Sequence, residues 1–205
     1  MPVSKHVNEI YSCVIQRMSA QDQDQEVKEA AILCVGILLS TTGDQLKEEL
    51  PQCLSLLIDR LRNEITRLTA VKSISMVAES KLAIDLSSVL EADMSELITI
   101  LRKANRPLRQ ASLTTLGGLI NGPSDARIQP ETISRVLEEA SNLVSDEYLH
   151  ISALALQLGT SVLSKSSSSV TVVCDTLLPR SLTLVASPLL QGQALLDLQV
   201  RGLYM

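Results

Sequence analysis

Five segments of the chain begin with the same order of residue types, and they recur about 41 residues apart. Each opens with a residue that commonly caps the start of a helix: Asp24, Asn63, Asn105, Asp146 and Ser187. The seventh residue after each cap is small, namely Ala31, Ala70, Ser112, Ala153 and Ala194. The eighth is apolar, namely Ile32, Val71, Leu113, Leu154 and Leu195. Such regular spacing indicates a chain that folds as repeated copies of one small unit.

A period near 40 residues is typical of stacked pairs of antiparallel helices. We therefore predict an all-α fold, a right-handed α-solenoid of about five HEAT repeats. We expect one continuous domain over residues 1–205, because each repeat packs mainly on its neighbours. The predicted repeats are about 1–43, 44–80, 81–122, 123–165 and 166–205. Residues 197–205 lose the pattern and form an atypical C-terminal end.

Helical periodicity places two helices in each repeat. The first helices are predicted at about 3–19, 46–63, 86–103 and 130–144, with a fifth ending near residue 186. The second helices are predicted at about 24–43, 64–79, 106–120 and 147–164, with a fifth that Ser187 and Pro188 open. The chain has no Trp and no Phe, and its aliphatic side chains suit packing between helices.

The charge balance argues against several classes of partner. The net charge is −5, from 18 basic and 23 acidic residues, whereas a nucleic-acid-binding protein usually presents a strongly basic face. The longest apolar stretch, residues 30–39, is about half the length that spans a bilayer. We find no apolar signal core at the N-terminus and expect protein partners only, in the cytoplasm and nucleus.

Residues that carry chemistry are sparse. The cysteines are Cys13, Cys34, Cys53 and Cys174, and without a Cys-x-x-Cys pair we expect four reduced, buried thiols. The acidic pair Glu138 and Glu139 is adjacent in a predicted helix, so the two carboxylates diverge by about 100°. We predict no catalytic, cofactor-binding or metal site, and therefore not an enzyme.

A basic column runs through the repeats, four residues after each cap. It consists of Lys28, Arg67, Arg109 and His150, with Gln191 in the fifth repeat. In HEAT repeats such a column commonly forms a hydrogen-bonded ladder with the caps of neighbouring repeats. We predict that role for these four residues, with contact to a partner on the concave face as the alternative.

Several runs of sequence are more specific than helix packing requires. They are residues 22–36 (DQDQEVKEAAILCVG), 59–78 (DRLRNEITRLTAVKSISMVA), 84–90, 101–116 and 187–195. Together they resemble the cullin-associated and neddylation-dissociated family, also called the CAND or TIP-one-twenty proteins. The resemblance covers residues 1–196 and matches an interior portion of a much longer HEAT solenoid. Neither end of the chain looks like the polar capping repeat that usually closes a solenoid, so we expect a piece of a longer solenoid, or a truncated or alternatively spliced product.

The resemblance implies a non-catalytic regulator of cullin-RING ubiquitin ligases. Such proteins wrap around an unneddylated cullin and its RING subunit, block neddylation, and promote exchange of substrate receptors during SCF complex assembly. They need no cofactor. A different HEAT scaffold, of the phosphatase-scaffold or transport-receptor type, and an inactive fragment remain as alternatives.

Overall fold

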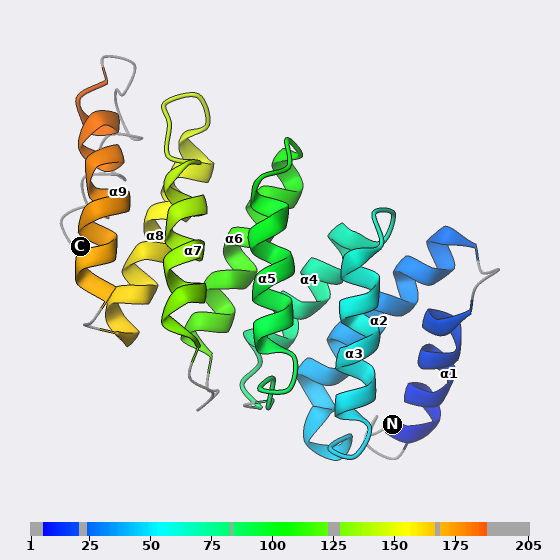
Figure 1. Ribbon diagram of the computed structural model, residues 1–205. Coiled ribbons are helices and arrows are strands. Elements are labelled where there is room, and N and C mark those ends of the chain that lie inside the picture. Colours follow the sequence, from blue (N-terminus) through cyan, green and yellow to red (C-terminus); the bar gives the residue numbers. More distant parts are fainter. Residues whose placement is uncertain (1–5, 21–23, 83, 123–127, 167–168, 188–205) are drawn as a thin grey trace. The chain divides into compact units, whose positions relative to one another are not determined.

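A computed structural model describes the chain except for residues 1–5, 21–23, 83, 123–127, 167–168 and 188–205 (Figure 1). The described part is helical. Its α-helices are α1 (Val7–Ser19), α2 (Gln25–Thr42), α3 (Leu50–Arg62), α4 (Arg67–Ala78), α5 (Leu90–Leu101), α6 (Arg106–Asn121), α7 (Pro130–Ser141), α8 (Leu149–Lys165) and α9 (Val170–Val185). A short 3-10 helix, η2 (Gly43–Gln45), follows α2. The predicted all-α repeat fold is confirmed.

The chain divides into two compact units. Unit 1 comprises Met1–Glu96 and Gly122–Arg127, and unit 2 comprises Leu97–Asn121 and Ile128–Met205. Unit 1 holds the first two helix pairs, α1–α2 and α3–α4, and unit 2 holds α6 to α9. The single continuous domain over residues 1–205 stays a prediction. The atypical end at 197–205 and the helix expected after Ser187 lie outside the described residues.

In unit 1 the second helices of two successive repeats, α2 and α4, pack against each other. A Cβ atom added to Gly36 of α2 would lie 2.9 Å from the Cα of Ser73 on α4, so the two backbones approach closely. The Ser73 hydroxyl donates to the Ile32 carbonyl at 2.8 Å, and the two residues are 41 positions apart. The Ser80 hydroxyl donates to the Ser40 carbonyl at 2.6 Å.

Unit 2 repeats this arrangement with α6 and α8. The Asn121 amide on α6 donates to the Ser161 hydroxyl on α8 at 2.9 Å, across 40 positions. The Ser187 hydroxyl donates to the Asp146 carboxylate at 2.9 Å, across 41 positions. Hydrogen bonds at the repeat spacing therefore occur in both units, and they confirm the period that the sequence shows.

The predicted caps divide into two groups. Asp24 accepts from the Glu26 N–H at 2.8 Å and caps α2, and Asn105 accepts from the Leu108 N–H at 3.0 Å at the start of α6. Asn63 instead accepts from the Ile65 N–H, two residues before α4 begins. Asp146 accepts from Ser187, and α8 begins after Tyr148 without a side-chain cap. The helix-capping role is therefore wrong for Asn63 and Asp146.

The cysteines are free, but only Cys53 is buried. Burial raises the pKa of the Cys53 thiol to about 12, so it stays protonated. The prediction of four buried thiols is wrong for Cys13, Cys34 and Cys174, which are exposed. Cys34 in α2 occupies the same position in the repeat as Ser73 in α4. Ser73 is buried because α4 packs on α2, so burial at this position depends on the neighbouring helix.

None of the helices in the described ranges combines the length and the apolar character needed to cross a bilayer.

Candidate functional site

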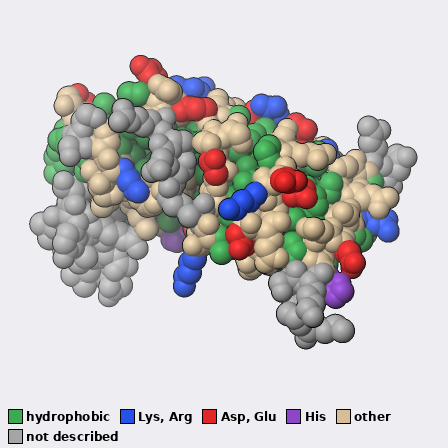
Figure 2. Space-filling model, turned by 90° about the horizontal axis from the view of Figure 1, so that it is seen from below, with side chains coloured by type: hydrophobic (Ala, Val, Ile, Leu, Met, Phe, Trp, Pro, Cys, Tyr) green, Lys and Arg blue, Asp and Glu red, His purple; other side chains and the backbone are tan. Residues whose placement is uncertain are grey.

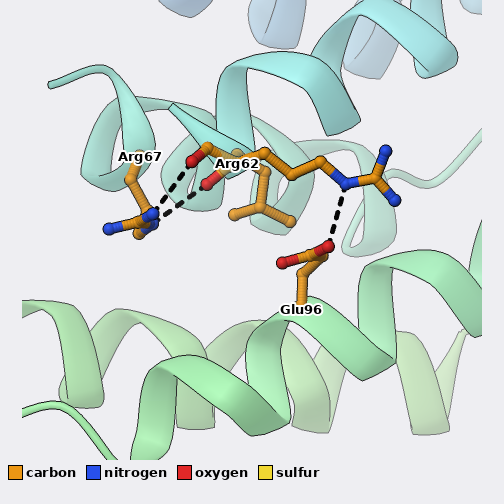
Figure 3. Close-up of polar contacts among 4 residues, drawn as sticks. Arg62, Arg67 and Glu96 are labelled. Atoms are coloured by element: carbon orange, nitrogen blue, oxygen red, sulfur yellow. Dashed lines mark hydrogen bonds and ion pairs between the residues drawn. The ribbon is translucent and has the colours of Figure 1, made fainter. Parts of the chain in front are cut away.

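The turn between α3 and α4 contains the run LRNEITRL. Most side chains of this run stabilise the turn. Arg67, whose side chain is only 13% exposed, donates from Nε to the Leu61 carbonyl at 3.1 Å and from Nη2 to the Arg62 carbonyl at 2.9 Å (Figure 3). The Thr66 hydroxyl donates to the Arg60 carbonyl at 2.9 Å. Arg67 and Thr66 thus satisfy carbonyls at the end of α3 that lack helical partners.

Arg109 makes the equivalent contact one repeat later. Its Nε donates to the Leu101 carbonyl, at the end of α5, at 3.1 Å. Lys28 lies half-buried in the first turn of α2, and His150 lies exposed in the first turn of α8. The hydrogen bonds of Arg67 and Arg109 lie within one helix pair. The ladder between repeats and the concave-face contacts therefore stay predictions for Lys28, Arg67, Arg109 and His150.

Two ion pairs join the first helices of successive repeats. The Arg62 Nε lies 2.8 Å from the Glu96 Oε1, linking α3 to α5 within unit 1 (Figure 3). The Nε of Arg102, one residue beyond the end of α5, lies 2.7 Å from the Oε1 of Glu139 on α7, within unit 2. Sequence reasoning missed these pairs, although both arginines end their segments with the same Leu-Arg dipeptide. Glu139 is therefore an interhelical partner of Arg102 rather than half of a paired-carboxylate site.

The contacts of Arg67 and Arg62 predict unequal effects of two similar substitutions. Replacing Arg67 by methionine should lower the free energy of unfolding by about 2 kcal/mol, because a charged group then no longer satisfies two backbone carbonyls. Replacing Arg62 by methionine removes a surface ion pair and should lower the free energy of unfolding much less than the Arg67 substitution does. Urea unfolding of the two variants measures the difference, and equal losses would contradict this account of the turn.

One residue of the run has no such role. Ile65 is 63% exposed, although isoleucine is usually buried. Its neighbour Glu64 is also exposed. Helix packing does not require an apolar side chain at this place, so Ile65 is a candidate for contact with another protein.

One carboxyl group lies in the interior of unit 1. Asp93 on α5 is 2% exposed, and its Oδ1 has no hydrogen-bond partner among the described residues. Burial raises the pKa of this carboxyl to about 7. No second titratable group is identified beside it that would make a general acid–base pair among the described residues.

The remaining charges are dispersed. On the face that Figure 2 shows, Lys and Arg side chains alternate with Asp and Glu among neutral and apolar ones. In the described part of the chain, no three His, Cys, Asp or Glu side chains converge as metal ligands would.

Comparison with solved structures supports the repeat fold. Two engineered proteins known from crystal structures are similar, with TM-scores of 0.69 and 0.70 over 99% and 96% of this chain, and 83% and 80% of theirs. Sequence identity to both is 14%, so the likeness concerns the fold alone. No family model matches the sequence.

Sequence comparison identifies closer relatives. The chain is 52% identical over 196 residues to cullin-associated NEDD8-dissociated protein 1 of Arabidopsis thaliana, which covers 94% of this chain and 16% of that protein. It is 37% identical to the Drosophila melanogaster protein of the same name, over 92% of this chain and 15% of that one. It is 41% identical to cullin-associated NEDD8-dissociated protein 2 of Mus musculus, over 93% of this chain and 15% of that protein. The chain thus spans about one sixth of the length of these relatives, and by sequence it matches one portion of the cullin-associated NEDD8-dissociated family.

Proposed function

We propose that the chain is a non-catalytic HEAT-repeat scaffold that binds a cullin–RING complex whose cullin is unneddylated. In this role it takes part in substrate-receptor exchange and SCF complex assembly, in the cytoplasm and nucleus. The observation that supports the proposal most is the 52% identity, over 94% of the chain, to a protein named for its association with cullins.

The proposed mechanism is competition between protein surfaces. A scaffold that binds cullin where an adaptor also binds is coupled to that adaptor by a free energy of about 1–3 kcal/mol, without any chemical step. A specific interface takes about 800 Å² from each partner.

A binding experiment tests the proposal. The purified chain, immobilised, should retain an unneddylated cullin–RING pair and should retain the neddylated pair at least tenfold less. In the same experiment Ile65→Asp should weaken retention, because a charge then replaces an exposed apolar side chain while the hydrogen bonds of the turn remain. A circular-dichroism spectrum confirms that the variant is folded. Failure to retain any cullin, neddylated or not, would overturn the proposal.

A further inference from the structure

Tyr148 lies in the exposed loop between α7 and α8, immediately before α8 begins. It is 37% exposed, whereas Tyr11, the other tyrosine in the described ranges, is 7% exposed. Asp146 and Glu147 precede Tyr148 and are exposed as well. The loop is held in place from within unit 2, because the Ser152 hydroxyl donates to the Ser145 carbonyl at 2.7 Å and accepts from the Ser145 N–H at 2.9 Å.

An arginine from the neighbouring repeat lies beside this tyrosine. The Arg106 guanidinium on α6 stands 5.3 Å from the centre of the Tyr148 ring. A hydrogen bond to Glu147 raises the pKa of the Tyr148 hydroxyl, while the charges of Arg106 and Arg109 act to lower it. The ring that carries the hydroxyl therefore lies against a cation on α6.

We propose that Tyr148 is a phosphorylation site and that Arg106 holds the phosphate. A protein tyrosine kinase supplies the group from Mg²⁺-bound ATP. The Tyr148 Oη attacks the γ-phosphorus, the Oη–P bond forms, the bond from that phosphorus to the bridging oxygen breaks, and ADP and a proton leave.

The surroundings of Tyr148 suit both its phosphorylation by a kinase and the binding of the added phosphate by arginine. Because the side chain and the two acidic residues before it are exposed, a kinase can reach the hydroxyl without unfolding a helix. A phosphate bearing about two negative charges repels Glu147 and attracts guanidinium groups, which bind phosphate oxygens with paired N–H donors. The modification would then tie the start of α8 to α6, in the adjacent repeat.

The first experiment asks where phosphate enters. In a Tyr204→Phe background, which leaves Tyr11 and Tyr148, the chain is incubated with a non-receptor tyrosine kinase domain and Mg²⁺-ATP, and the product is mapped by mass spectrometry. We expect phosphate at Tyr148 and at least tenfold less at Tyr11. Equal labelling of Tyr11, or no labelling of either residue, would overturn the assignment.

The second experiment asks whether Arg106 holds the phosphate, with phosphotyrosine placed at position 148 by genetic code expansion. We expect the thermal unfolding midpoint to rise by roughly 2–4 °C relative to the unmodified chain. We also expect ³¹P spectroscopy to give a second phosphate pKa below its usual value of about 6. Both effects should disappear in Arg106→Gln. A phosphorylated chain with an unchanged midpoint and pKa, or one that Arg106→Gln leaves unaltered, would contradict the proposed contact.

Discussion

Replacing Gly36 by valine is expected to lower the free energy of unfolding by about 3 kcal/mol, because α2 and α4 leave no room for a side chain there. A Cβ at this position would lie 2.9 Å from both Cα and Cβ of Ser73 and 3.0 Å from Cε of Met76. The methionine end can move, but the Ser73 backbone can move only if α4 shifts. Such a shift also lengthens the 2.8 Å hydrogen bond from Ser73 to the Ile32 carbonyl.

Gly117 provides a matched control, since it also lies inside a helix but a Cβ there meets nothing within 4 Å. Gly117→Ala should raise the free energy of unfolding by about 0.5–1 kcal/mol, because alanine favours the helix more than glycine does. Urea unfolding followed by circular dichroism measures both variants. If Gly36→Ala and Gly117→Ala were equally stabilising, the close approach of α2 and α4 would be contradicted.

The helix pairs could be predicted because the repeat constrains the same positions many times over. The small column that includes Ala31 and Ala70 recurs where helices meet, and both residues are buried. Gly36 itself could not be singled out in this way. The sequence shows a glycine within a helix, but only the packing of α4 on α2 shows why a larger residue is excluded.

The candidate site was less predictable, because spacing identifies columns but not hydrogen-bond partners. A long arginine side chain can reach carbonyls of its own helix pair or groups of the next repeat. Arg67 and Arg109 donate to the helix ends of their own pair. The ion pairs between repeats came instead from Arg62 and Arg102, which belong to none of the repeat columns.

Asp93 is a carboxylic acid on the otherwise apolar, buried face of α5. Leu90, Met94 and Leu97 mark the buried face of α5, and Asp93 lies three residues after Leu90 on that same face. The equivalent residue one repeat earlier is Cys53, which follows the leucine that begins α3 by the same three positions and is also buried. A carboxyl therefore occupies a position that an uncharged side chain fills in the neighbouring repeat.

This burial makes stability depend on pH in a predictable direction. The pKa of the Asp93 carboxyl is 3.8 in its ordinary state and about 7 in the folded chain, so the folded state holds the proton more tightly. The resulting stability is fully present below pH 4 and is lost as the pH rises towards 7. A shift of about three pKa units corresponds to about 4 kcal/mol.

Asp93→Asn should remove this dependence, because the amide does not ionise. The free energy of unfolding of the variant relative to the parent chain is expected to increase by about 4 kcal/mol between pH 4 and pH 8, measured by urea unfolding. Asp85→Asn is the control with the opposite sign, because hydrogen bonds from Ser87 lower the pKa of that exposed carboxylate. The Asp85 variant should therefore lose stability relative to the parent as the pH rises through the acid range. If the free energies of unfolding of Asp93→Asn and the parent chain differed by the same amount from pH 4 to pH 8, the pKa of the Asp93 carboxyl would not be raised. The carboxyl would then be hydrated in the folded chain.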